Sequence, residues 1–210
     1  MQLPVTTLYQ QAFRSHTEHM ELSRERERYS WADYLQWPED ERYELVEGVP
    51  YAMSPAPGRR HQEIGGELFH QMYSALRGTS CRVFHAPFDV KLSAQEADDA
   101  PTVLQPDITV TCDPAKLTKQ GVSGAPDLVV EIVSPDSGLA DRRREFDLYQ
   151  TYGVGEYWIV DQDESLVEVY RLDSDGRYQR AGVYGKEDRL SASVVPDLEI
   201  DLAAVFAAAD

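Results

Sequence analysis

Two short apolar segments of the chain are each interrupted by a carboxylate. The first spans residues 105–111 (QPDITVT) and contains Asp107, and the second spans residues 127–134 (DLVVEIVS) and contains Glu131. Both segments have the length and the β-branched composition of core strands. A buried carboxylate without a partner is costly or becomes protonated, so it normally binds a cation or a hydrogen-bond donor. If the two strands are neighbours, Asp107 and Glu131 can converge on one divalent cation.

Such a pair would have a definite chemistry. Carboxylate oxygens, with main-chain carbonyls and water, are the ligands that Mg²⁺ and Mn²⁺ prefer. A bound ion lowers the pKa of a coordinated water and stabilises charge that develops on a phosphoryl group. The alternative is that the two carboxylates only cap neighbouring loops at strand ends.

The composition is that of one globular domain. Of the 210 residues, 42% are hydrophobic and 10% are aromatic, as in folded proteins with a sizeable core. Residues 1–28 are polar and charged and are expected to form an extension to a domain over residues 29–210. No run approaches the roughly 18 apolar residues of a membrane helix, and the first 20 residues lack the apolar centre of a signal peptide. We therefore expect a cytoplasmic protein without a membrane segment.

The charge restricts the partners. A net charge of −17 opposes the long-range attraction with which proteins coat duplex DNA. Basic clusters at residues 59–61 (RRH) and 142–144 (RRR) leave open the binding of nucleic acid in a narrow cleft. Nucleic acid is thus a possible partner, but general duplex binding is disfavoured.

The two cysteines, Cys81 and Cys112, lie in or beside expected strands. They lack the CxxC spacing of a zinc site or a redox motif. We expect both to be buried and reduced.

Periodicity and turn residues predict a mixed α/β (α+β) fold, with a mixed β-sheet flanked by two main helices. Ser30 is a suitable N-cap for a short helix at residues 31–35, and Gly153 is suited to end a helix. The expected main helices are residues 60–76 and 139–152, with a short one at 202–208. The expected strands are residues 42–48 and 49–53, paired around Gly48, and residues 82–85, 88–92, 107–112, 128–134, 156–161, 166–172, 178–184 and 191–195. Residues 93–102 are expected to be a loop.

Several ordered segments resemble a known family. They are YELVEG (43–48), HQ (61–62), APFDV (86–90), QPD (105–107), APDLVVEIVSP (125–135), Tyr149, GV (153–154) and EYWIVD (156–161). In these segments, which span about residues 30–205, the chain resembles the Uma-two family of the restriction-endonuclease-like superfamily, whose signature is PD…(D/E)xK.

The resemblance implies a metal-dependent nuclease in which Asp107 and Glu131 bind Mg²⁺ or Mn²⁺. It also implies a lysine that orients the attacking water, but the position two after Glu131 is Val133. In this family the lysine is usually displaced onto the following helix, four residues before the tyrosine that matches Tyr149. That position is Glu145 here, so an anion replaces the expected cation.

Two other cations are candidate replacements for the lysine. Arg144 precedes Glu145, although it points about 100° away around a helix, and Lys91 lies in the strand expected over residues 88–92. Asp89 is a candidate third metal ligand. Glu44 and His61 are candidate accessory residues. The alternative for Glu44 is a salt bridge beside the hairpin, and the alternative for His61 is a helix cap or a surface position.

Three functions are compatible with these residues. The first is a Mg²⁺- or Mn²⁺-dependent endonuclease. The second is a catalytically impaired relative that acts as a binding or assembly module, which Glu145 and the negative charge favour. The third is a metal-dependent hydrolase of small nucleotides. In each case we expect a homodimer.

Overall fold

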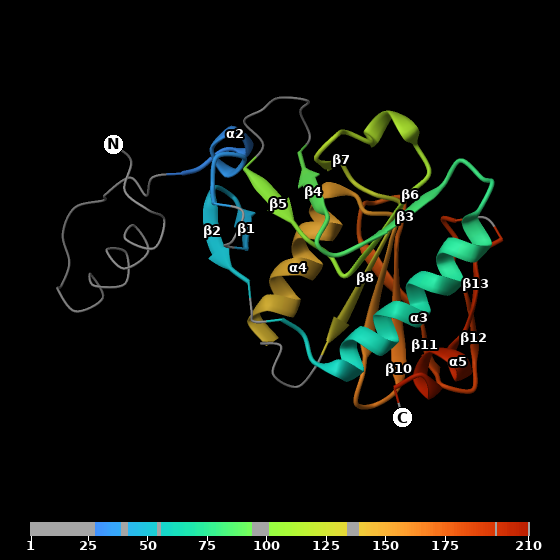
Figure 1. Ribbon diagram of the computed structural model, residues 1–210. Helices are drawn as coiled ribbons and strands as arrows, with labels where there is room; N and C mark the ends of the chain where they lie inside the picture. The colour runs from blue at the N-terminus through green and yellow to red at the C-terminus, as the bar shows by residue number, and fades with distance from the viewer. Residues whose placement is uncertain are drawn as a thin grey trace.

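The computed structural model describes residues 28–38, 42–53, 56–93, 101–133, 139–195 and 197–209. Helices and strands are interspersed along these residues (Figure 1), which confirms the predicted mixed class of fold. The extension expected over residues 1–28 lies outside them apart from Arg28, as does most of the loop expected over 93–102. No helix among the described residues is long and apolar enough to cross a membrane.

The strands of the described residues form two larger sheets and one small sheet, where the sequence predicted one. Sheet A has the order β2 (Val49–Ala52), β1 (Tyr43–Val46), β5 (Thr102–Leu104), β4 (Asp89–Leu92), β7 (Gly121–Ser123). Sheet B has the order β11 (Tyr178–Gly185), β10 (Leu166–Leu172), β9 (Glu156–Asp161), β8 (Leu128–Val133), β6 (Ile108–Thr111), β3 (Arg82–His85). The small sheet pairs β12 (Arg189–Ser191) with β13 (Glu199–Asp201). The chain passes from sheet A to sheet B between β5 and β6, through the segment that contains Asp107.

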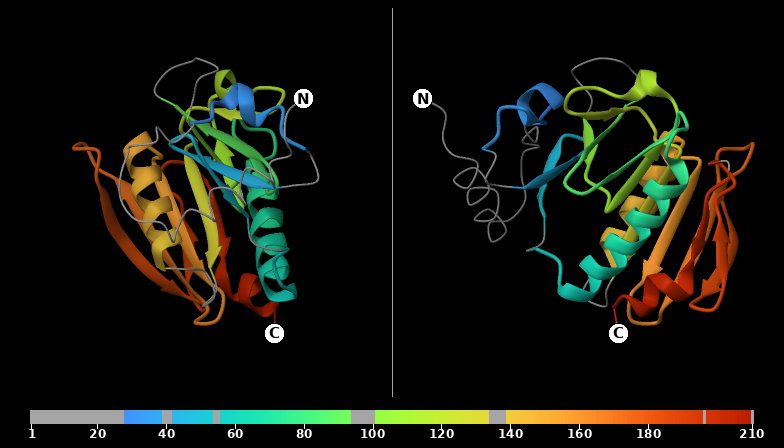
Figure 2. Two further views of the ribbon diagram at one scale, coloured as in Figure 1. Left: turned by 90° about the vertical axis from the view of Figure 1, so that its left-hand side faces the viewer. Right: turned by 45° about the vertical axis from the view of Figure 1, so that its right-hand side comes forward.

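The two main helices lie on opposite faces of sheet B (Figure 2). Helix α4 (Leu139–Tyr152) lies between the sheets, where Tyr149 packs in one cluster with Val90 of sheet A and Tyr157 of sheet B. Helix α3 (Arg59–Leu76) covers the other face together with the short helix α5 (Leu202–Ala207). The order of layers is therefore sheet A, α4, sheet B, then α3 with α5.

The apolar spacing in α3 explains its position. Ile64, Leu68, Met72 and Leu76 recur every four residues and are the buried residues of this helix, as the sequence predicted. Residues at that spacing share one helix face. Full burial of each such side chain contributes about 1.5–3 kcal/mol, so this face holds α3 firmly against sheet B.

The outer face of sheet A is covered by the N-terminal part of the described chain. Helix α2 (Trp31–Tyr34) begins at Ser30, whose side chain accepts a hydrogen bond from the Asp33 N–H. Asp33 in turn accepts one from the Ser30 N–H at 2.8 Å, which completes a capping box. Trp31 then packs on Leu45 and Val103 of sheet A.

The expectation of two reduced cysteines was wrong, because Cys81 and Cys112 form a disulfide. Strands β3 and β6 pair antiparallel with Arg82 opposite Thr111. The next pair outward is Cys81 and Cys112, so the register brings the two sulfur atoms together. Their separation of 31 residues in sequence gave no sign of this pairing.

Candidate active site

Asp107 and Glu131 lie side by side at the end of the β6–β8 pair. In that antiparallel pair Ile108 is opposite Val130, so Asp107 and Glu131 are the next residues outward. The Asp107 main-chain N–H donates a hydrogen bond to Glu131 Oε2 at 3.3 Å. The two strands are therefore neighbours. The sequence predicted that the two carboxylates converge if this condition holds.

The carboxylate of Asp107 is held from two elements. Its Oδ2 accepts a hydrogen bond from the Ile132 N–H of β8 at 2.8 Å and lies 3.1 Å from His61 Nε2 of α3. Burial of His61 opposes the charged imidazolium, but the hydrogen bond and the charge of Asp107 outweigh burial and raise the pKa of His61. His61 therefore joins the site through Asp107.

The carboxylate of Glu131 faces the layer that contains α4. Its Oε1 accepts a hydrogen bond of 2.6 Å from the buried hydroxyl of Tyr149. Burial, then the charges of Glu145, Asp107 and Glu44, raise the pKa of Glu131 well above its ordinary value, and the Tyr149 hydrogen bond only partly offsets this. Glu131 is thus a partly buried acid close to other acids.

Glu145 is one of these acids and lies on α4. It precedes Tyr149 by four residues, and side chains at this spacing share a helix face. Its charge also raises the pKa of the Tyr149 hydroxyl. The position at which the family resemblance implied a lysine therefore carries a negative charge that acts on Glu131.

Arg144 lies on α4 directly before Glu145 and contacts β2. Its guanidinium carbon lies 4.2 Å from the centre of the Tyr51 ring on β2. Tyr51 is opposite Glu44 in the β1–β2 pair. Glu44 in turn accepts a hydrogen bond of 3.0 Å from the main-chain N–H of Gln105, two residues before Asp107. Arg144 is thus connected to the segment before Asp107 through Tyr51 and Glu44.

Lys91 lies on the other face of sheet A. Val90 and Leu92 point into the core that contains Tyr149, so Lys91, between them, points the opposite way. Its ammonium lies 5.9 Å from the centre of the Trp31 ring, and the residue is 8% exposed. The structure therefore does not bring Lys91 to the carboxylate pair.

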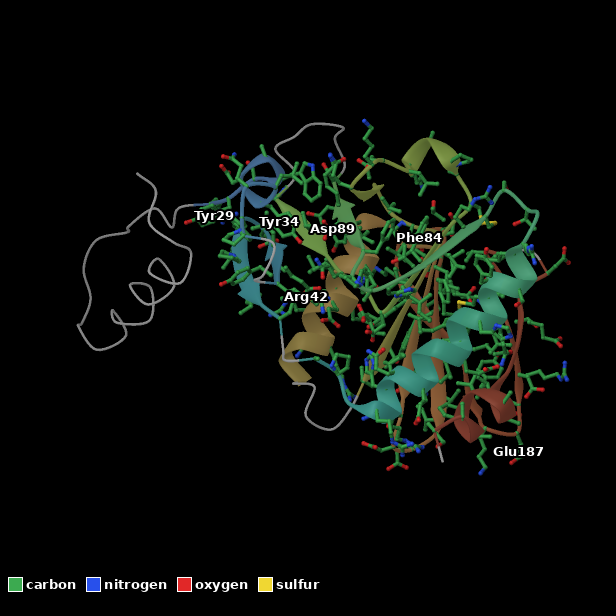
Figure 3. The ribbon with its side chains drawn as sticks, viewed as in Figure 1. Tyr29, Tyr34, Arg42, Phe84, Asp89 and Glu187 are labelled. Carbon is green, nitrogen blue, oxygen red and sulfur yellow. A yellow bond between two sulfur atoms is a disulfide. The ribbon has the colours of Figure 1, made fainter. Side chains whose placement is uncertain are left out.

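Asp89 belongs to a second polar cluster that sequence reasoning missed. Its Oδ1 accepts hydrogen bonds from the Tyr34 hydroxyl (3.0 Å) and from Gln105 Nε2 (2.9 Å), and Gln105 Oε1 accepts one from Arg42 at 2.7 Å. Burial raises the pKa of Asp89, while these hydrogen bonds lower it in part. Tyr34, Arg42 and Asp89 are labelled together in Figure 3. Asp89 is thus engaged away from Asp107 and Glu131.

The comparisons with known proteins agree with this fold. The family described as "Putative restriction endonuclease", Uma-two, matches residues 31–203. The chain belongs to the Uma-two family. This confirms the resemblance that the ordered sequence segments indicated.

One relative in sequence is the uncharacterised protein slr1290 of Synechocystis sp. (strain ATCC 27184 / PCC 6803 / Kazusa). It is 29% identical over 161 residues, which are 75% of this chain and 81% of the relative. A solved structure with a similar fold is a "putative nuclease belonging to DUF820" from Anabaena variabilis ATCC 29413. It has a TM-score of 0.68 and 20% identity, and the match covers 86% of this chain and 99% of that one.

The donor set of this Uma-two protein suits a hard divalent cation. Asp107 and Glu131 offer carboxylate oxygens, which such cations prefer, and nearby negative charges favour a cation beside Glu131. Within the part of the chain that the structure describes, no three His, Cys, Asp or Glu side chains are grouped as a complete metal site. An ion at the pair would therefore take further ligands from main-chain carbonyls, water or substrate.

A recess of about 220 Å³ opens beside Asp107. It lies between α3 and the end of β3, on the side of Asp107 that faces His61. Its walls are formed by His61, Gln62, Gly65, Gly66, Phe69, His85, Ala86, Asp107 and Ile132. The recess therefore reaches the side chain of Asp107, which is 23% exposed.

Proposed function

We propose that this protein is a divalent-cation-dependent nuclease that hydrolyses phosphodiester bonds at Asp107 and Glu131. The observation that carries the proposal is the register of β6 and β8, which sets two carboxylates side by side in a Uma-two chain. The similarity of fold to a protein described as a nuclease supports it.

In this proposal Asp107 and Glu131 hold Mg²⁺ or Mn²⁺. When bound, such an ion would supply a water of lowered pKa and stabilise charge on the phosphoryl group. The chain's own residues orient the two ligands. The Ile132 N–H and His61 fix the Asp107 carboxylate, and the Tyr149 hydroxyl fixes that of Glu131.

Arg144 is the residue that we assign to the electrostatic role of the displaced lysine. Its guanidinium carries a permanent charge and suits a phosphate oxygen. Its contact with Tyr51, which is opposite Glu44 in the β1–β2 pair, supports this assignment. Glu145 works in the opposite sense, because its charge repels a phosphate that approaches Glu131.

The proposal is tested by incubating plasmid and single-stranded DNA with Mg²⁺ or Mn²⁺ and the wild type, Asp107→Asn, Glu131→Gln or Arg144→Ala. We expect the wild type to cleave, the two carboxylate variants to lose at least 100-fold in rate, and Arg144→Ala to lose at least tenfold. Circular dichroism establishes that each variant is folded. Cleavage that persists in Glu131→Gln would overturn the assignment of the site.

A second candidate is a non-catalytic binding module with the same fold. The influence of Glu145 on Glu131 favours it, since an anion occupies the place of the expected cation. If the wild type is inactive and Glu145→Lys cleaves DNA, the natural chain is an impaired nuclease. The net charge also permits a hydrolase of small nucleotides. Assays with small nucleotides beside DNA distinguish this hydrolase from a nuclease.

A further inference from the structure

Helix α3 and strand β3 together carry three neighbouring aromatic rings, of which Tyr73 and His85 are exposed and Phe69 is partly buried against the core. Phe69 stacks on Tyr73 with ring centres 5.9 Å apart, and the His85 ring meets Phe69 edge to face at 4.9 Å. Tyr73 is 53% exposed, which is unusual for a large apolar ring in this protein. These three residues are called the aromatic row below.

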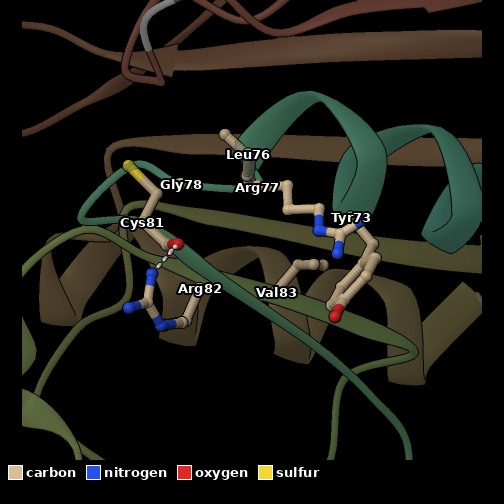
Figure 4. Close-up of a pocket in the computed structure, with 7 residues that line it drawn as sticks. All are labelled: Tyr73, Leu76, Arg77, Gly78, Cys81, Arg82 and Val83. Carbon is tan, nitrogen blue, oxygen red and sulfur yellow. Dashed lines mark hydrogen bonds between the residues drawn. The ribbon is translucent and has the colours of Figure 1, made fainter.

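The aromatic row joins two recesses. At one end Phe69 and His85 line the recess beside Asp107. At the other end Tyr73 lines a recess of about 180 Å³ together with Arg77 and Arg82. Figure 4 shows these residues around that recess, with Arg82 donating a hydrogen bond to the Cys81 carbonyl. The row therefore leads from two arginines to Asp107, one of the two candidate catalytic carboxylates.

Two consecutive glycines mark the Asp107 end of the row, and only one of them is needed for packing. A Cβ on Gly65 would lie 3.2 Å from Ile132 Cδ1, so Gly65 permits the close approach of α3 to β8. A Cβ on Gly66 would meet nothing within 4 Å. Glycine within a helix is less stable than alanine, so packing does not account for Gly66. Gly66 lines the recess beside Asp107, which a larger side chain at this position would narrow.

The acidic residues of α3 are turned away from the row. Glu67 accepts a hydrogen bond from the Gln71 amide, which also donates one to the main-chain carbonyl of Asp201 beside α5. Glu63 is paired with Arg59 at 2.9 Å. Arg77 and Arg82 at the far end are therefore not neutralised by the acids of this helix, in a chain whose overall charge is −17.

We propose that this face of α3 and β3 binds a single strand of nucleic acid and leads it to Asp107. Exposed rings stack on bases, whose faces are accessible only in a single strand, and arginines contact the phosphates between them. From Gln62 to Arg77 the helix rises about 22 Å, enough for several nucleotides. The inference rests on the proposed nuclease function and specifies its substrate as single-stranded.

The test is the binding of fluorescein-labelled 12-nucleotide single strands of DNA and RNA, and of the matching DNA duplex, in EDTA. Fluorescence anisotropy gives Kd for the wild type, Tyr73→Ala, Gly66→Leu and Arg77→Ser. Arg180→Ser is the matched control, because it removes an exposed arginine at the opposite edge of sheet B. Thermal denaturation establishes that each variant is folded.

We expect the wild type to bind the single strands at least tenfold more tightly than the duplex. Tyr73→Ala and Gly66→Leu should each weaken single-strand binding at least fivefold, and Arg180→Ser should change it less than twofold. Arg77→Ser should lower the slope of log K against log salt by about 0.7, the value for one phosphate contact on a single strand.

Equal Kd values for Tyr73→Ala and the wild type would overturn the proposal, as would a preference for the duplex. So would a result in which Tyr73→Ala alters only self-association, because the row would then be a protein contact. Binding in EDTA does not depend on cleavage. If the strands bind as expected and no divalent ion gives cleavage, the nuclease function fails while the single-strand surface stands.

Discussion

Glu131 is the residue whose ionisation most directly reports on the candidate site. Burial and the charges of Glu145 and Asp107 raise its pKa, so without a cation the ionised side chain destabilises the fold at neutral pH. Glutamine removes the charge, and its amide can still accept from the Asp107 N–H and donate to the Tyr149 hydroxyl. We expect Glu131→Gln to raise the free energy of unfolding in EDTA by about 1–3 kcal/mol at pH 7.5, measured by urea denaturation.

The pH dependence of stability shows why Glu131→Gln should stabilise the protein. The pKa of Glu131 is higher in the folded than in the unfolded chain, so the stability contributed by the neutral acid is complete below pH 4.5. It is lost as the pH rises through the raised pKa. The advantage of Glu131→Gln should therefore grow with pH. Mg²⁺ should raise the Tm of the wild type but not that of the variant. Equal stability of both proteins at every pH would contradict the prediction.

His61 makes a second contribution that depends on pH. Its pKa is raised above 6.5 in the folded chain, chiefly by Asp107 acting against burial. The stability from this ion pair is therefore complete below pH 6.5 and is lost as the pH rises through the raised pKa. We expect His61→Gln to be less stable than the wild type by about 1 kcal/mol at pH 6 and to approach it at pH 9. Urea denaturation across this range measures the difference, and a constant difference would show that His61 acts only through packing.

At the scale of elements, regular patterns in the sequence predicted the parts that carry the site. The four-residue apolar repeat predicted α3 within one residue, and α4 was predicted with its observed bounds Leu139–Tyr152. Gly153, with φ of 84°, ends α4 as expected of a residue in the left-handed region. The strands β5, β7 and β13 were missed, because three residues are too few to show alternation. The strand expected over residues 191–195 was misplaced, since the strand there is β12, Arg189–Ser191.

Glu156 shows how one element is fixed by a polar side chain within the core. This residue of β9 is fully buried and accepts hydrogen bonds from Trp158 Nε1 (2.7 Å) and from the Ser193 N–H (2.8 Å) and Oγ (2.6 Å). Arg171 of β10 lies 3.3 Å away. Glu156→Ala leaves these donors without an acceptor, so we expect a loss of about 3 kcal/mol in the free energy of unfolding.

The matched control for Glu156 is Glu168→Ala on β10. Glu168 is 32% exposed, lies 3.7 Å from Arg180 and accepts a hydrogen bond of 2.8 Å from the neighbouring Tyr170 hydroxyl. A surface pair of this kind is worth about 0–1 kcal/mol, so the control should lose no more than that. Urea denaturation measures the free energy of unfolding of both variants. Similar losses in this free energy would refute a special role for the buried carboxylate of Glu156.

For the whole molecule, the sequence could not show how two sheets meet. Both strands of the candidate carboxylate pair were predicted, because each is a continuous apolar run around one acid. The placement of Asp89 and Lys91 was not predictable, since it depends on which face of sheet A turns toward α4. Two further features likewise depend on how distant segments pack together. They are the disulfide between Cys81 and Cys112 and the contact of Arg144 with Tyr51.

The net charge of −17 raises the question of whether repulsion acts on the substrate through the whole molecule or locally at Glu145. Glu145→Lys and Glu187→Lys each replace −1 by +1 and so change the net charge from −17 to −15. Glu187 is exposed in the turn between β11 and β12, and Figure 3 shows it at the lower right of the molecule, far from α4. The two variants therefore carry the same total charge with different local fields.

The Debye length is about 8 Å at 0.15 M salt, so a distant surface charge is largely screened there while a neighbour of Glu131 is not. We expect Glu145→Lys to raise kcat/KM for single-stranded DNA at least tenfold at this salt concentration, and Glu187→Lys to change it less than twofold. At 0.01 M salt, where the Debye length is about 30 Å, both variants should bind the strand more tightly. If the two variants gain equally at 0.15 M, the total charge limits the reaction and Glu145 has no special place in it.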